Sequence, residues 1–177
     1  MSDRFPWLLN LCGGIDFSPG PGPTYLTMSH GGPSFAPFIC FEETQPQLVS
    51  DATRLHPDFF VTLTNDDWFS GVTTGWVVNQ QLQNALLRTV EHDRTLVRCA
   101  NNGISCEIDP NGNVVTRVHD KTGETAGVMG ILSRNLVLRP PQTTIYERCG
   151  DWVGLICQLA TFVAGFYFLR KSKAKST

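Results

Sequence analysis

The chain has 177 residues, of which 41% are hydrophobic and 17% are charged, and its formal net charge is −2. This length is ordinary for one domain with a sizeable core. A net charge near zero gives no support for nucleic-acid binding, which usually requires a basic field. The 16 glycines and 11 prolines follow no fixed period, so a collagen-like chain is excluded.

Strands and helices alternate in the predicted order of elements. Residues 13–37 are rich in Gly, Pro and Ser, and this composition predicts loops and turns. The hydrophobic pattern beyond them predicts regular elements over 35–40 (strand), 45–55 (helix), 59–64 (strand), 74–92 (helix), 95–100, 103–108 and 113–118 (strands). Residues 109–112, Asp-Pro-Asn-Gly, form a strong hairpin turn between the last two strands. This order is typical of an α/β fold.

The end of the sequence predicts a membrane span. Residues 152–169 carry no charged side chain. About 18 helical residues reach roughly 27 Å, close to the hydrocarbon thickness of about 30 Å. We therefore predict a transmembrane helix over 151–170, followed by a basic cytoplasmic tail over 171–177. The positive-inside rule then places residues 1–150 on the outer side of the membrane. The alternative is a buried C-terminal helix with a solvated basic end.

The first residues do not match a secretory signal. Residues 1–14 contain an acid at Asp3 and a short apolar run interrupted by Pro6. A domain on the outer side of a membrane needs an export signal or a membrane segment ahead of it. We therefore expect the sequence to be a fragment.

Cys40 is the strongest candidate for a reactive group. It ends an apolar strand, and after Phe41 the chain continues with Glu42, Glu43 and a predicted helix. Such junctions expose side chains in α/β folds, and a helix N-terminus lowers the pKa of a thiol. The alternative is a core cysteine beside solvated acids. The six cysteines and four histidines show no zinc spacing and no Cys–His pair, so neither a metal nor a cofactor is predicted, and most cysteines are expected to be buried.

Four segments occur in one order and carry a family resemblance: ICFEE, VTLTNDDWFSG, LQNALLRTVEHDRTLVRCANNGISCEIDPNGNVV and a late GDW. Over about residues 14–170 the chain resembles the C-terminal part of apolipoprotein N-acyltransferases, membrane-bound members of the nitrilase (carbon–nitrogen hydrolase) superfamily. The resemblance implies a partial nitrilase-type αββα sandwich over 1–150, followed by the transmembrane helix. A chain that begins inside such a sandwich is expected to expose apolar strand faces.

The resemblance also implies an activity and its partners. These enzymes transfer an acyl chain from a phospholipid to the N-terminal cysteine amine of a diacylglyceryl lipoprotein. Cys40 would be the nucleophile and form a thioester. The implied location is the bacterial inner membrane, with the globular domain on the periplasmic side. The implied partners are the phospholipid donor, the lipoprotein acceptor, membrane lipid and a missing N-terminal half.

Further site residues are implied by matching positions. Glu42 would support the nucleophile loop, and Phe41 stands where the family carries Tyr. The others are the segment Asn65, Asp66 and Trp68, the helix pair Arg88 and Glu91, and the turn Asn101, Asn102 and Gly103. The helix pair also fits a solvated surface pair, and the turn also fits a plain hairpin.

Two groups of the family's catalytic triad are not matched. No glutamate precedes Cys40, and the single lysine outside the basic tail, Lys121, follows it. Without a cationic oxyanion partner we expect a loss on the order of 10² to 10³ in rate or more, so the chain alone is predicted to be inactive. The alternatives are a nitrilase-like amidase or hydrolase acting on a soluble amide, and a non-catalytic membrane-anchored binding domain.

Overall fold

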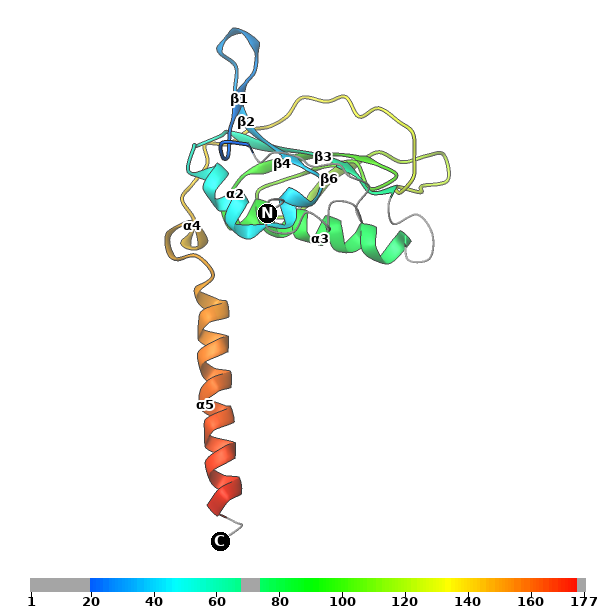
Figure 1. Ribbon diagram of the computed structural model, residues 1–177. Coiled ribbons are helices and arrows are strands. Elements are labelled where there is room, and N and C mark those ends of the chain that lie inside the picture. Colours follow the sequence, from blue (N-terminus) through cyan, green and yellow to red (C-terminus); the bar gives the residue numbers. More distant parts are fainter. Residues whose placement is uncertain (1–19, 68–73, 175–177) are drawn as a thin grey trace, which may run out of the picture.

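One mixed sheet of six strands organises the computed structural model, which describes residues 20–67 and 74–174 (Figure 1). The strands lie in the order β1-β2-β3-β4-β5-β6. Their bounds are β1 Leu26–Thr27, β2 Ser34–Ile39, β3 Phe59–Asn65, β4 Thr95–Asn101, β5 Cys106–Ile108 and β6 Val114–Arg117. The predicted α/β class is confirmed. The strand predicted over 103–108 begins later, at Cys106, because residues 102 and 103 form a bend and Ile104 forms an isolated bridge with Ala126.

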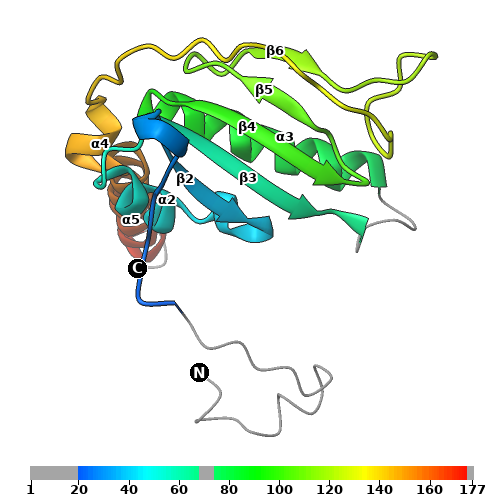
Figure 2. The same ribbon diagram turned by 90° about the horizontal axis from the view of Figure 1, so that it is seen from above.

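The three central strands β2, β3 and β4 are parallel, and the outer pairings are antiparallel. Ile39 of β2 pairs with Leu63 of β3, which pairs with Cys99 of β4. Parallel strands end at the same edge of a sheet, and that edge is where α/β folds place their ligands. The segments after Ile39, Asn65 and Asn101 therefore meet at one edge, which we call the carboxyl edge (Figure 2).

The helices cover one face of the sheet. The bounds are η2 Ser29–Gly31, η3 Cys40–Thr44, α2 Pro46–Thr53, α3 Thr74–His92, α4 Ile145–Cys149 and α5 Trp152–Ala174. Both views show α2 and α3 packed against the same face (Figures 1 and 2). Helix α3 turns Val78, Leu82 and Ala85 inward, the spacing of an amphipathic helix.

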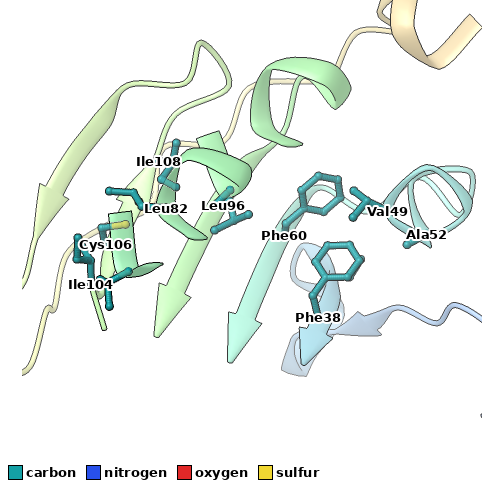
Figure 3. Packing of buried hydrophobic residues seen from close by; sticks show 12 residues of the cluster. Phe38, Val49, Ala52, Phe60, Leu82, Leu96, Ile104, Cys106 and Ile108 are labelled. Carbon is teal, nitrogen blue, oxygen red and sulfur yellow. The ribbon is translucent and has the colours of Figure 1, made fainter. Parts of the chain in front are cut away.

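The hydrophobic core lies between this face and the two helices (Figure 3). Phe38 of β2 and Phe60 of β3 meet edge to face, with ring centroids 5.3 Å apart, and Val49 of α2 is buried in the same cluster. Leu82 of α3 lies beside Leu96 of β4 in the other half of the cluster (Figure 3). Alternate residues of each strand supply the core, as the two-residue period of a strand requires.

The opposite face of the sheet remains apolar and open. Ile39 is 66% exposed and Leu63 is 54% exposed, and Cys99 beside them is exposed too. Phe35 and Phe59 lie on the same face at the other end of the strands, with ring centroids 5.4 Å apart. This matches the expectation that the chain exposes apolar strand faces.

Helix α5 stands away from the sheet, and none of its side chains whose burial is described belongs to the core (Figure 1). Within residues 20–67 and 74–174, none of the helices combines the length and the apolarity that crossing a membrane requires. The predicted transmembrane helix over 151–170 is therefore not supported. The division into 1–150, 151–170 and 171–177 stays a prediction.

Candidate active site

Cys40 is the first residue after β2 and opens the 3₁₀ helix η3. Its φ is +53°, in the left-handed region that a side chain with a Cβ rarely adopts. Such strain persists only where surrounding contacts impose it, and it is concentrated at functional sites. The contact that holds this conformation is local, because the Ile39 amide donates to Glu42 Oε2 at 2.7 Å. The bond closes the turn around Cys40, which is half-buried at the carboxyl edge.

Behind this turn lies a buried network of three charged residues. Glu43 follows Glu42 and is fully buried, and its Oε1 accepts from Arg98 Nε of β4 at 3.1 Å. Arg98 Nη2 donates to Asp66 Oδ2 at 3.1 Å, and Nη1 donates to the carbonyl of Ile104 at 2.9 Å. Burial raises the pKa of Glu43, against the attraction of Arg98. Burial also disfavours the Arg98 cation, but Glu43 and Asp66 outweigh it and raise the pKa of Arg98.

Asp66 connects this network to the end of β4. Its Oδ1 accepts from Thr64 Oγ1 at 2.7 Å, and its amide donates to the Asn101 carbonyl at 3.0 Å. Gly103 packs directly against the carboxylate, since an added Cβ would lie 2.0 Å from Asp66 Oδ2. The position therefore requires glycine for space.

An outer layer of carboxamides continues the same edge. Asn65 Oδ1 accepts from Asn101 Nδ2 at 3.1 Å and from the Asp67 amide at 3.2 Å. Asn102, with a φ of +59°, donates from Nδ2 to Asp67 Oδ1 at 2.8 Å. The ends of β3 and β4 are thus joined by side chains as well as by the strand ladder. A strained cysteine and a rigid polar rim on one edge form an arrangement suited to nucleophilic catalysis.

Curated proteins similar to this chain share one name. The chain is 42% identical to an apolipoprotein N-acyltransferase of Bradyrhizobium diazoefficiens over 121 residues, 68% of this chain and 20% of that protein. It is 34% identical to that of Shewanella oneidensis over 142 residues, 80% of this chain and 25% of that one. It is 30% identical to apolipoprotein N-acyltransferase 2 of Treponema pallidum over 165 residues, 91% of this chain and 28% of that one.

The chain belongs among the relatives of the apolipoprotein N-acyltransferases. It spans between about a fifth and just over a quarter of the length of the curated relatives it matches. No protein-family model matches the sequence. A solved amidase of the nitrilase superfamily from Nesterenkonia has a TM-score of 0.47 and 18% identity, over 60% of this chain and 40% of the amidase.

Most of the site residues predicted from the sequence lie together at the carboxyl edge of the sheet. These are Cys40, Phe41, Glu42, Asn65, Asp66, Asn101, Asn102 and Gly103. Phe41 is 58% exposed, on the turn that carries Cys40. Trp68 lies outside the described residues.

The predicted ion pair on helix α3, Arg88 with Glu91, lies away from the Cys40 turn. Arg88 Nη1 and Glu91 Oε2 are 2.7 Å apart, so the pair forms. It lies near the end of α3, where Thr144 Oγ1 donates to the Glu91 carbonyl and joins α3 to α4. The neighbouring His92 ring is 6.1 Å from that of Phe60, which is near the start of β3. The structure therefore places Arg88 and Glu91 at the amino edge of the sheet, away from the carboxyl edge that carries Cys40.

The ion pairs beside the cysteine turn are those of Arg98, which the sequence analysis did not identify. The two-residue period of a strand could have identified Arg98. It lies two positions after the core residue Leu96, so its side chain points to the same buried face. A buried arginine needs carboxylate partners. Asp66 directly follows β3, and Glu43 lies in η3, the short helix that follows β2.

The other ionisable groups add little to this edge. Lys121 is exposed in the turn over 120–123, and no described contact joins it to Cys40. Among the described parts of the chain, no group of three His, Cys, Asp or Glu residues could hold a metal ion.

The expectation that most cysteines are buried is wrong for the five described, because only Cys106 is buried. Burial raises the pKa of Cys106 to about 11.

Proposed function

We propose that this chain carries the nucleophile-bearing part of an apolipoprotein N-acyltransferase, with Cys40 as the nucleophile. The observation that carries the proposal is the strained Cys40 turn, held by Glu42 and by the buried Glu43–Arg98–Asp66 network at the carboxyl edge. The name shared by the curated relatives supplies the reaction class. The alternative of a small-amide hydrolase is weaker, because these relatives are acyltransferases by name.

The reaction has two balanced steps. The Cys40 sulfur attacks the ester carbonyl of a phospholipid, a C–S bond forms, the ester C–O bond breaks and the lysophospholipid leaves with the thiol proton. The amine of a diacylated lipoprotein then attacks the thioester carbonyl. A C–N bond forms, the C–S bond breaks and the amine proton returns to the sulfur. Splitting the transfer in this way replaces one difficult step by two easier ones.

The chemistry needs a base and an oxyanion donor that the described residues of this edge do not supply. We propose that a further polypeptide segment packs on the open apolar face and brings both groups. Ile39 and Leu63 are more than half exposed beside the end of β2, and an apolar surface next to a reactive residue favours a protein partner. This segment would complete the partial αββα sandwich.

We also propose that α5 contacts lipid. Its exposed side chains include Leu159, Phe162 and Val163, and its basic end at Arg170 and Lys171 suits an anionic surface. In a vesicle flotation assay, Val163→Lys is expected to reduce recovery with the vesicles. Val115→Lys, the same change at an exposed valine of β6, is the control. Equal recovery of both variants would refute lipid contact by α5. The inner-membrane location with a periplasmic domain stays a prediction.

The proposed activity is tested with a labelled phospholipid and a diacylated lipopeptide. The chain alone is expected to be inactive. Co-expression with the remaining part of the Bradyrhizobium relative is expected to restore transfer of label to the lipopeptide amine. Cys40→Ser should abolish this transfer, and Cys149→Ser, at a free and exposed cysteine of α4, should leave it intact. Transfer that survives Cys40→Ser, or no transfer from the co-expressed pair, would overturn the proposal and favour a non-catalytic binding domain.

A further inference from the structure

A second feature of the carboxyl edge is a hollow of about 400 Å³ beyond the cysteine turn. It is lined by Asp67, Ala100, Asn101, Asn102, Gly127, Val128 and Met129. The three polar side chains come from the ends of β3 and β4. The rest of the lining is Ala100 of β4 and the segment over 127–129. Met129 is fully exposed, so it stands at the rim.

The hydrogen bonds around this hollow fix which polar atoms a ligand can reach. Asn101 donates from Nδ2 to Asn65, and Asn102 donates from Nδ2 to Asp67 Oδ1. Each carboxamide group uses one of its two N–H donors in this way and keeps its Oδ1 as an acceptor. Asp67 keeps its second carboxylate oxygen and gives the hollow a formal negative charge. This charge, flanked by two carboxamide oxygens, favours a cationic ligand that carries N–H donors.

The backbone around the hollow holds these acceptors in place. Asn102 lies in the left-handed region, and Gly127 approaches it so closely that an added Cβ would lie 2.8 Å from Asn102 Oδ1. Residue Ile104 forms a bridge with Ala126, which ties the segment over 127–129 to the turn after β4. The site is thus formed before a ligand arrives, which lowers the entropic cost of binding.

We propose that this hollow binds the primary ammonium group of the acyl acceptor. One carboxylate and two carboxamide oxygens match the single charge and three donors of an ammonium. A divalent cation prefers more carboxylate oxygens than the one available here. Val128 and Met129 supply apolar surface for the group next to the ammonium. The inference rests on the proposed function, because it names the part of the same edge that receives the acceptor. Binding at this hollow involves no covalent step.

The test measures binding separately from acyl transfer. A diacylated lipopeptide with a free N-terminal amine is titrated into the isotope-labelled protein in detergent micelles, and the side-chain amide signals of Asn101 and Asn102 are followed by NMR. Both signals are expected to shift. The N-acetylated lipopeptide should leave them unchanged, because it lacks the ammonium. Asp67→Asn should weaken binding of the free amine by about tenfold or more, and Asp67→Glu should restore part of it.

Asp51→Asn is the matched control. Asp51 is an exposed aspartate whose Oδ1 also accepts from a side-chain amide, that of Gln47 at 2.9 Å. This variant is expected to bind as the unmodified chain does. Equal binding of the acetylated and free peptides, or equal binding by Asp67→Asn and Asp51→Asn, would overturn the hollow as an ammonium site. Failure of the proposed function is a different result, because the amide signals would still shift while Cys40 acquired no acyl group even in the chain co-expressed with the remaining part of the Bradyrhizobium relative.

Discussion

The two edges of the sheet both bury arginine, but they use it differently. At the carboxyl edge Arg98 is held by Glu43, Asp66 and a backbone carbonyl, all within 3.1 Å. At the amino edge Arg94 Nη1 is 3.7 Å from Glu147 Oε1 and donates instead to the carbonyl of His92. The first arrangement fixes the turns that carry the candidate site. The second attaches α4 to α3. The two edges differ in how many acids one arginine joins. Arg98 joins two buried carboxylates that follow different strands, whereas at the amino edge Arg88 pairs with Glu91 and Arg94 with Glu147.

The largest expected effect comes from breaking the tight network. Arg98→Met leaves Glu43 and Asp66 buried without their partner, so we expect a loss of about 3–5 kcal/mol in the free energy of unfolding. Urea denaturation measures it. Arg117→Met, at an exposed position on β6, removes the same charge and should change the free energy by less than about 0.5 kcal/mol. A similar small loss for both variants would mean that the buried network does not stabilise the carboxyl edge.

A smaller effect is expected from crowding the same network. Gly103→Ala places a methyl group against Asp66 and displaces it from Arg98, which should cost about 2–3 kcal/mol. Gly75→Ala is the control, because nothing lies within 4 Å of a Cβ added there. Equal urea midpoints for the two variants would contradict the close packing of Gly103 on Asp66.

The amino edge should respond to pH. Burial, with Arg88 and Arg94 adding repulsion, lowers the pKa of His92 from 6.5 to about 4, although Glu147 lies 3.6 Å away. The unfolded chain takes up this proton below its ordinary pKa and the folded chain does not. Stability is therefore full above pH 6.5 and falls as the pH drops through this window toward 4.

His92→Phe should remove that fall. We expect the unmodified chain to lose about 2 kcal/mol more than this variant between neutral pH and about pH 4.5. Urea titrations at both pH values measure the difference. His119→Phe, at an exposed histidine, should keep the fall. If His92→Phe loses stability as steeply as His119→Phe, another group controls the amino edge.

Sequence patterns predicted the fold better than they predicted the charge network. The β-branched and aromatic run over 59–64 and the helical spacing of Leu82, Ala85 and Leu86 are local signals, and both elements form where expected. Val90, predicted on the same helix face, is instead half exposed. The Glu43–Arg98 pair joins residues 55 positions apart, so its formation depends on strand order, which no local pattern contains. The Arg88–Glu91 pair is local and forms, but its position along α3 places it at the other edge.

The central claim is that Cys40 carries the acyl group as a thioester. Mass spectrometry of the chain co-expressed with the remaining part of the Bradyrhizobium relative tests it most directly, after incubation with phospholipid and without an acceptor. We expect one added acyl chain on the peptide containing Cys40, removed by hydroxylamine and absent in Cys40→Ser. An acyl group on another residue, or none on Cys40 while the lipopeptide is still acylated in a parallel reaction, would contradict it.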